Sequence, residues 1–369
     1  MHLLVNIVLF VVYSLYSGLT QLILSGLKKK PELADQTEDS YSVSILIAAR
    51  NEVRNISNTL DSIINSDFSK SNFEIVVVND HSEDLTEKIV RDWSATHPGI
   101  DISVYLNDGK GKKEAVRTGV LAAKYDVVLQ TDADCAVSKN WIKAMTIPFA
   151  NRNVNLVAGP VFFVKKKSFW NKIQYIEFLS LIASSIGLSR MGWHVMANAA
   201  NLAFRKEVWL GISKDEKSKS GDDVFLLQRI AKQNENAICY LSENNSVVYT
   251  NGSRSIKEFI DQRVRWASKS GEYPSKNAKW VGILVFRVSL AQLYIYGLWI
   301  SASGNALHLV LFFSKFVFDY WLLSRFSKEQ GIALSPLAVF FLFLIYPFYF
   351  VYVGVLSLFY KPKWKGRSL

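Results

Sequence analysis

Two carboxylates stand where an apolar run of this chain ends. Asp132 and Asp134 follow residues 127–131, and their spacing places both side chains on one side of an extended strand. Such a pair suits a hard divalent cation that keeps several waters and also binds phosphate oxygens. An Asp-x-Asp pattern by itself is equally typical of a solvated turn. Its position at the end of a buried strand favours metal binding.

A second carboxylate pair, Asp222 and Asp223, precedes the apolar residues 224–227. Acidic side chains stabilise a helix start by capping it and by interacting with its dipole. Taken alone, this pair is therefore explained as a helix N-terminus.

A third group combines arginine with tryptophan. Gln262, Arg263, Arg265 and Trp266 fall in an expected helix, where Gln262 and Trp266 share one face. Arginine offers a forked donor for a diphosphate, and the indole offers a flat apolar surface for a sugar ring. An interfacial helix whose arginines reach toward water is the plainer interpretation, and the two are compatible.

The elements that must position these groups alternate between strand and helix. We expect strands at 43–47, 73–78, 102–106 and 127–131, and helices at 55–64, 85–93 and 112–124. This order predicts a mostly parallel, doubly wound α/β sheet. Ligands of such sheets bind beyond the carboxyl ends of the strands, where Arg50, Glu52 and Asp80 also fall. Residues 151–275 are less regular, and the long apolar stretch 169–188 fits either a core helix or a helix on a membrane face.

Hydrophobic residues gather at the two ends of the 369-residue chain. Residues 3–27 exceed the roughly 20 needed to cross a bilayer, and three lysines follow, which favour the cytoplasmic side. A signal peptide is the rival interpretation, but its positive charge should precede the apolar run. Three further runs occupy residues 281–301, 307–323 and 334–359.

These four runs raise a problem of topology. If all of them crossed, a cytoplasmic middle would leave the C-terminus outside, although the tail 361–369 is basic and should stay inside. One run is therefore expected not to cross. Lys315 and Asp319 are costly in lipid, so we expect their segment to be a re-entrant or interfacial piece.

The net charge of +11 suits a protein that rests on anionic lipid and handles phosphates. Nucleic-acid binding is disfavoured by the membrane runs. Two cysteines far apart in sequence indicate free thiols rather than a disulfide framework.

The expected organisation has five parts. They are a membrane anchor (1–30), a linker (31–42), a cytosolic domain (43–275, with a nucleotide-sugar half at 43–135 and an acceptor half with interfacial helices at 136–275), C-terminal membrane segments (276–360) and a basic tail (361–369).

From Val43 to Trp266 and into the membrane runs, the chain resembles the membrane-bound family 2 glycosyltransferases, which are inverting enzymes with a Rossmann-like GT-A fold. The matching stretches are Ser44–Glu52, Val78–Ser82, Gly111-Lys112, Thr131–Asp134, Gly221–Asp223 and the complete Gln-x-x-Arg-Trp motif Gln262–Trp266. Asn79 stands where the family has an aspartate, so that role passes to Asp80 alone. Asp222 replaces a glutamate.

The resemblance implies a role for each site residue. Asp134 would bind Mg²⁺ or Mn²⁺ directly, with Asp132 beside it on the nucleotide side, and Asp223 would be the general base. The donor, a UDP-sugar by resemblance, would contact Arg50, Glu52, Asp80, Lys112 and Asp132. The acceptor and diphosphate would contact Asp222, Gln262, Arg263, Arg265 and Trp266.

The acceptor stays open between a membrane lipid, which we favour, and a growing polysaccharide, which needs a channel. Outside this class, a non-catalytic membrane scaffold and a nucleotidyltransferase are the rivals, and the intact acidic set and the Gln-x-x-Arg-Trp helix count against them. The expected location is the cell inner membrane, with the catalytic domain in the cytoplasm.

Overall fold

A computed structural model describes residues 2–31, 41–213, 222–359, 363–364 and 367–368. Most of the expected linker, Gly221 and most of the basic tail lie outside these residues. The strands are β1 Val43–Ala49, β2 Phe73–Asn79, β3 Ile102–Leu106, β4 Val127–Asp132, β5 Ala136–Val137, β6 Leu156–Ala158, β7 Val161–Phe163, β8 Leu202–Arg205, β9 Ile238–Tyr240, β10 Val248–Thr250, β11 Lys363–Trp364 and β12 Arg367–Ser368. The helices are α1 His2–Lys28, α2 Ile56–Ile64, α3 Thr86–Thr96, α4 Lys112–Ala122, α5 Trp141–Thr146, α6 Phe169–Ser189, α7 Lys206–Ser213, α8 Asp222–Gln233, α9 Ile256–Ala267, α10 Lys276–Ile300, α11 Ala306–Glu329 and α12 Pro336–Leu356.

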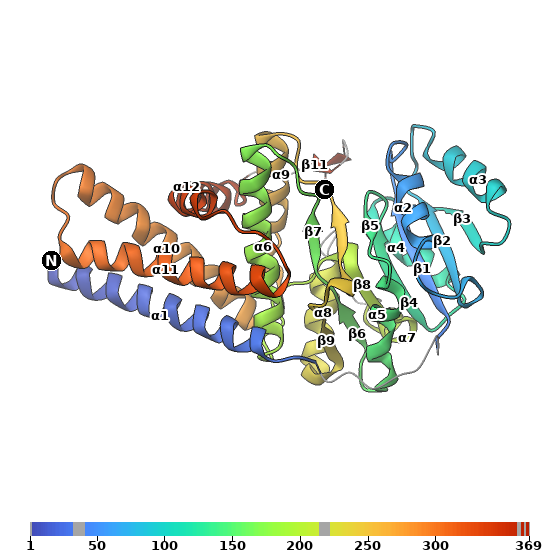
Figure 1. The fold of residues 1–369 in the computed structure, drawn as a ribbon, viewed down its shortest axis with the longest axis horizontal. Coiled ribbons are helices and arrows are strands. Elements are labelled where there is room, and N and C mark those ends of the chain that lie inside the picture. The colour runs from blue at the N-terminus through green and yellow to red at the C-terminus, as the bar shows by residue number, and fades with distance from the viewer. Residues whose placement is uncertain (1, 32–40, 214–221, 360–362, 365–366, 369) are drawn as a thin grey trace.

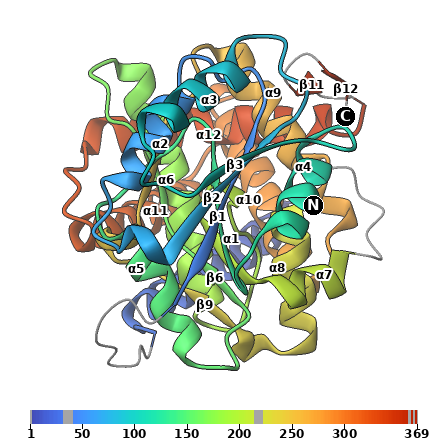
Figure 2. The same ribbon diagram turned by 90° about the vertical axis from the view of Figure 1, so that its right-hand side faces the viewer.

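The central sheet has seven strands in the order β3-β2-β1-β4-β8-β6-β9. The pairs β1–β2, β1–β4, β2–β3 and β6–β9 are parallel, and β8 runs antiparallel to both of its neighbours. Every residue of β2 is buried, as expected for a strand covered on both faces. Figure 2 shows α2, α3 and α5 on one side of the sheet and α4, α7 and α8 on the other. The expected mostly parallel α/β fold is confirmed.

The sheet places the ends of β1, β2 and β4 at one edge, because Ala48 is in register with both Val78 and Asp132. The four strands and three helices expected across residues 43–135 all form, with ends that differ by a few residues. A second sheet, β5-β10-β7, lies in the later half of the domain, where the strands have only two or three residues. Strands this short leave little periodicity for sequence analysis to detect.

Four helices are long and apolar enough to cross a membrane: α1, α10, α11 and α12. Figure 1 shows α1, α10 and α11 running side by side away from the sheet domain, whereas α12 is seen nearly along its own axis. Helix α12 therefore lies across the other three. It sits where the bundle meets α6 and α9, which stand between the bundle and the sheet.

The segment that holds Lys315 and Asp319, which we expected to be re-entrant or interfacial, is helical throughout. It belongs to α11, one continuous helix of 24 residues that packs along α1. Its charges are compensated inside the bundle, because Lys315 Nζ lies 2.6 Å from Asp319 Oδ2 and the Tyr16 hydroxyl donates to Asp319 Oδ1 at 2.5 Å. The helix that departs from the common direction is the more apolar α12.

The backbone of α1 packs directly against the backbone of α6. At the crossing of α1 and α6, a Cβ atom added to Gly26 would lie 1.9 Å from the Gly187 carbonyl oxygen, and one added to Gly187 would lie 2.5 Å from the Ile23 carbonyl oxygen. Only glycine permits this approach. The long apolar helix α6 is thus buried between the domain and the membrane-type helices, a position that combines both interpretations of stretch 169–188.

Candidate active site

A cavity of about 550 Å³ lies beyond the carboxyl ends of β1 and β4, between the sheet and helices α6, α8 and α9. Its wall includes Asp134, Asp223 and Trp266, which are far apart in sequence. Of the other expected site residues, it also includes Arg50, Glu52, Lys112, Asp132, Gln262 and Arg265. Asp80 and Arg263 are not among the lining residues. Asp222 is the first residue of α8, and its side chain lies outside the described part of the chain.

Asp80 supports the cavity from behind. Its side chain is 1% exposed, and Oδ1 accepts hydrogen bonds from Asn107 Nδ2 at 2.7 Å and from the Gly111 amide at 3.0 Å. These bonds fix the loop that leads into α4 and therefore fix Lys112, the first residue of that helix. The Lys112 ammonium reaches the cavity and lies 2.5 Å from Asp132 Oδ1.

Arg50 and Glu52 hold the loop that follows β1. The Arg50 guanidinium donates to the carbonyl oxygens of Asp80 at 2.8 Å and His81 at 2.6 Å, and it pairs with Glu83 at 2.9 Å. Glu52 Oε2 accepts from Asn55 Nδ2 at 2.7 Å. The Arg50 contacts tie the loops after β1 and β2 together beside the cavity.

Asp132 and Asp134 form the only metal-type donor pair that we assign among the cavity residues described. Both are half-buried, and Thr59 fixes the turn between them by donating to the Ala133 carbonyl at 2.9 Å. Within the described residues no three Asp, Glu, His or Cys side chains cluster as a metal site. Two carboxylates alone fit Mg²⁺ or Mn²⁺, which keep waters and bind substrate phosphate.

The neighbouring Cys135 is buried and is not among the residues that line the cavity. Burial, followed by the charges of Asp132 and Asp134, raises the pKa of the Cys135 thiol well above its usual range. Burial likewise raises the pKa of Cys239 to about 12. Both cysteines are free and buried, as expected from the sequence.

Asp223 is held by a turn that sequence analysis left without a role. Its Oδ2 accepts from the Ala199 amide at 2.9 Å. The turn around Ala199 is itself capped by Asn198, whose Oδ1 accepts from the Ala200 amide at 3.0 Å. The Ala200 carbonyl in turn accepts from Thr131 Oγ1 at 2.9 Å. The half-buried carboxylate is therefore oriented from the end of β4, the strand that carries Asp132.

Helix α9 presents two faces. Ser255 caps it by accepting from the Glu258 amide at 3.2 Å. Gln262, Arg265 and Trp266 face the cavity. Arg263 lies behind them, where its guanidinium stacks 4.5 Å from the Trp266 ring centroid.

Arg263 is bound to a carboxylate from another helix. Its Nε donates to Glu177 Oε1 on α6 at 3.0 Å, and its Nη2 donates to Glu177 Oε2. Burial alone would lower the pKa of Arg263, but the Glu177 carboxylate outweighs burial and raises it. Arg263 thus packs behind Trp266 and is not among the residues that line the cavity.

Glu177 is a buried residue beside the cavity that sequence analysis missed. It also accepts from the Tyr349 hydroxyl of α12 at 2.9 Å, so it joins α6, α9 and α12. A single carboxylate in the apolar-rich stretch 169–188 was the available signal, because a buried charge needs a partner.

Comparisons with known proteins show which proteins this chain resembles. Residues 44–210 match the family model described as Glycosyl transferase family 2. Poly-beta-1,6-N-acetyl-D-glucosamine synthases from Staphylococcus aureus (strain COL) and Staphylococcus epidermidis are each 30% identical, over 174 and 141 residues. The alignments span 47% and 38% of this chain, and 41% and 33% of those enzymes.

A solved structure covers nearly the whole chain. A mannosyltransferase from Pyrobaculum calidifontis, in complex with GDP-Man and Mn²⁺, superposes with a TM-score of 0.62 at 19% identity and covers 96% of this chain and 98% of its own. This likeness extends the shared fold to the long apolar helices.

Proposed function

Because the chain belongs to glycosyl transferase family 2, we propose that it moves a sugar from a nucleotide sugar, a UDP-sugar, to a lipid acceptor at the membrane, with inversion at the anomeric carbon. The observation that carries this proposal is the shared cavity of Asp134, Asp223 and Trp266. One compartment then offers a place for the diphosphate, a base and a flat apolar surface.

The transfer is a single displacement. The hydroxyl of the acceptor attacks the anomeric carbon as Asp223 takes its proton, a contribution of about 10²–10⁴-fold for a positioned base. The bond to the diphosphate breaks on the opposite face, so configuration inverts and no covalent intermediate forms. Arg265 and Lys112 line the cavity and stabilise the negative charge that develops on the leaving group.

The carboxylates of Asp132 and Asp134 are the groups that would hold Mg²⁺ or Mn²⁺. The ion, when bound, supplies further stabilisation of charge on the diphosphate. Lys112, now paired with Asp132, is close enough to serve the same phosphate.

The placement of charge supports a membrane orientation. Lys28 of α1, Lys276 and Lys279 of α10, and Arg325 and Lys328 of α11 all lie at the ends of their helices that face the sheet domain. The opposite end of the bundle holds the uncharged residues 301–305. The positive-inside rule then places the catalytic domain in the cytoplasm.

We further propose that α1, α10 and α11 cross the membrane, while α12 lies near its cytoplasmic surface. Three crossings keep the basic C-terminal tail on the same side as Lys28, which removes the conflict in topology. In a bacterial cell this orientation corresponds to the inner membrane.

A processive polysaccharide synthase is the second candidate. It is favoured by the staphylococcal relatives, whose names describe a polymer of N-acetylglucosamine. This chain matches less than half of their length, so the comparison does not extend to the whole of those enzymes.

A donor and product assay separates the candidates. The purified full chain in detergent, with Mn²⁺ or Mg²⁺, is offered UDP-N-acetylglucosamine, UDP-glucose and GDP-mannose together with a membrane lipid extract, and free nucleotide and products are measured. We expect release of UDP and a lipid that carries one added sugar. A polymer on a sizing gel supports the processive alternative, GDP release corrects the donor, and no nucleotide release from any donor rejects both.

A further inference from the structure

A second cavity, of about 310 Å³, lies inside the helix bundle. It is enclosed by α1, α6, α10, α11 and α12, and its wall is formed mainly by leucine, isoleucine, valine and phenylalanine. Along α11 it extends from Lys315 to Leu323, which corresponds to about 12 Å at the rise of an α-helix. Its volume falls in the range of pockets that hold small molecules, about 300–1,000 Å³.

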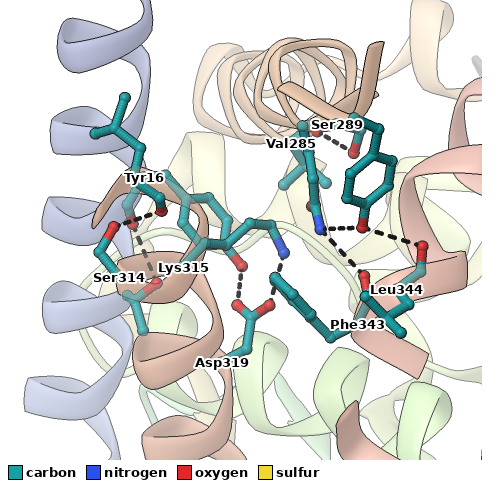
Figure 3. Close-up of polar contacts among 12 residues, drawn as sticks. Tyr16, Val285, Ser289, Ser314, Lys315, Asp319, Phe343 and Leu344 are labelled. Carbon is teal, nitrogen blue, oxygen red and sulfur yellow. Dashed lines mark hydrogen bonds and ion pairs between the residues drawn. The ribbon is translucent and has the colours of Figure 1, made fainter. Parts of the chain in front are cut away.

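The end of this bundle cavity at Lys315 is polar, but its charged side chains are paired with each other. Figure 3 shows Lys315 and Tyr16 both reaching the Asp319 carboxylate. The Lys315 ammonium also lies over the rings of Tyr16 at 5.2 Å and Phe343 at 5.1 Å, an arrangement that stabilises a desolvated cation. Because these charges are paired with each other, this end does not require a polar ligand.

The other end of the bundle cavity approaches the candidate base. Tyr273 lines it, and burial, followed by the negative charge of Asp223, raises the pKa of the Tyr273 hydroxyl well above its usual range. Met196 also lines it and lies three residues before Ala199, whose amide binds Asp223. Helix α6 contributes Phe178 to the active-site cavity and Leu181 to the bundle cavity. The two cavities are therefore neighbours on either side of the segment that holds Asp223.

We propose that the bundle cavity binds the hydrocarbon chain of the lipid acceptor and so presents the acceptor's hydroxyl to Asp223. A glycan would need hydrogen-bonding partners along its length, whereas this wall is mainly apolar and its ion pair is already satisfied. An alkyl or isoprenoid chain matches such a wall, because burying apolar surface is favourable at about 25 cal/mol per Å². This inference rests on the proposed function and adds where the substrate's tail is held.

Gly282 is a position at the cavity wall where a larger side chain can be added without a clash at its Cβ. It lines the cavity from α10, and a Cβ atom added there meets no other atom within 4 Å. Gly282→Leu therefore places a side chain in open space and also raises helix propensity. Gly297→Leu is the matched control, since Gly297 lies on the same helix, also has no atom within 4 Å of an added Cβ, and is not part of the cavity wall. Ser184→Leu fills the cavity from α6 and provides a second, independent variant.

The experiment uses the full chain in lipid nanodiscs and a dodecyl glucoside that carries a diazirine at the end of its chain. Photolabelled peptides are mapped by mass spectrometry, and transfer to dodecyl glucoside and butyl glucoside is measured in parallel. We expect labelling on α6, α10 or α11 at the cavity, reduced at least fivefold by Gly282→Leu and Ser184→Leu and unchanged by Gly297→Leu. The preference for the dodecyl over the butyl acceptor should fall in the same two variants. Nucleotide binding and melting temperature, measured for each variant, show that it is folded.

Two results separate failure of this inference from failure of the proposed function. Nucleotide-sugar consumption with labelling that Gly282→Leu and Ser184→Leu leave unchanged overturns the bundle cavity as the chain site, and leaves the glycosyltransferase assignment standing. Labelling that both variants reduce, without consumption of any nucleotide sugar, supports chain binding and overturns the proposed reaction.

Discussion

The active-site cavity and the bundle cavity both lie against α6, but the charged side chains in their walls are arranged differently. In the active-site cavity, the half-buried carboxylates Asp134 and Asp223 line the wall, and Asp223 also accepts from the Ala199 amide. In the bundle cavity, the charges of Lys315 and Asp319 face each other. A charge that performs chemistry must remain reachable, whereas a charge buried for structure needs its partner in place.

A second buried pair lies between the two cavities. Arg263 and Glu177 are almost fully buried, with side chains 6% and 3% exposed. They resemble Lys315–Asp319 in being closed, but they support Trp266 of the active-site cavity. The comparison therefore predicts that loss of a facing charge affects rate, loss of a closed pair affects stability, and loss of Glu177 affects both.

The largest effect is expected for Asp223→Asn. An amide cannot take the acceptor's proton, so transfer should fall by about 10²–10⁴-fold, while donor binding, measured by calorimetry with the nucleotide sugar, is retained. Asp92→Asn, an exposed position on α3, is the control and should leave the rate unchanged. Near-parental transfer by Asp223→Asn would remove the base from the proposed mechanism.

Glu177→Gln is expected to follow. It leaves the buried Arg263 guanidinium without a compensating charge, and breaking a buried pair typically costs about 3–5 kcal/mol. We expect a lower melting temperature together with reduced transfer, because the ring that Arg263 supports lines the active-site cavity. Asp92→Asn breaks the exposed pair Lys88–Asp92 and should leave the melting temperature nearly unchanged. Lower stability with unchanged transfer would restrict Glu177 to a purely structural role.

Lys315→Met should lower stability without a direct effect on donor binding. The single change leaves the Asp319 carboxylate unpaired in the bundle, at a cost comparable to other broken buried pairs, about 3–5 kcal/mol. The double variant Lys315→Met/Asp319→Asn should recover most of the melting temperature, because the neutral amide still accepts from Tyr16. Equal melting temperatures for the single and double variants would show that the pair carries no compensation.

The smallest effect concerns pH. Burial lowers the pKa of His194, whose ring contacts Ser189 Oγ at 2.7 Å and the Glu235 carbonyl at 3.1 Å. Below about pH 6.5 the imidazole is protonated in the unfolded chain, whereas in the folded chain it becomes protonated only at a lower pH. The free energy of unfolding therefore falls as pH decreases through this window. Thermal melts between pH 7.5 and 5.5 should show a small decrease that His194→Gln reduces. An identical decrease in the variant would assign the pH dependence to other groups.

The elements of residues 43–135 were predictable because they are long and regular. Val43–Ala49 and Phe73–Asn79 are buried, strongly apolar strands followed by polar turns, and the parallel order brings the polar turns together. The convergence of Asp134, Asp223 and Trp266 followed from motifs rather than from periodicity. Residues 136–275, with strands of two to four residues, offered no comparable pattern.

Partners in space were the part that sequence could not supply. Arg263 and Arg265 are the same residue type in one motif, but they occupy different faces of α9. Only the position of Glu177 on α6 determines that Arg263 is the buried one. The same holds for Lys315. Its sequence indicates an unfavourable buried charge, and only the structure shows that Asp319 and Tyr16 compensate this charge. The direction of α12 depends on packing against α6 and α9, which apolarity alone does not report.

The contact between Gly26 and Gly187 makes the first helix more than a tether. Because backbone meets backbone there, α1 behaves as a structural member of the enzyme, seated on the helix that also lines both cavities. Replacing α1 with an unrelated hydrophobic helix would preserve a hydrophobic first segment, but it would remove the surface against which α6 packs.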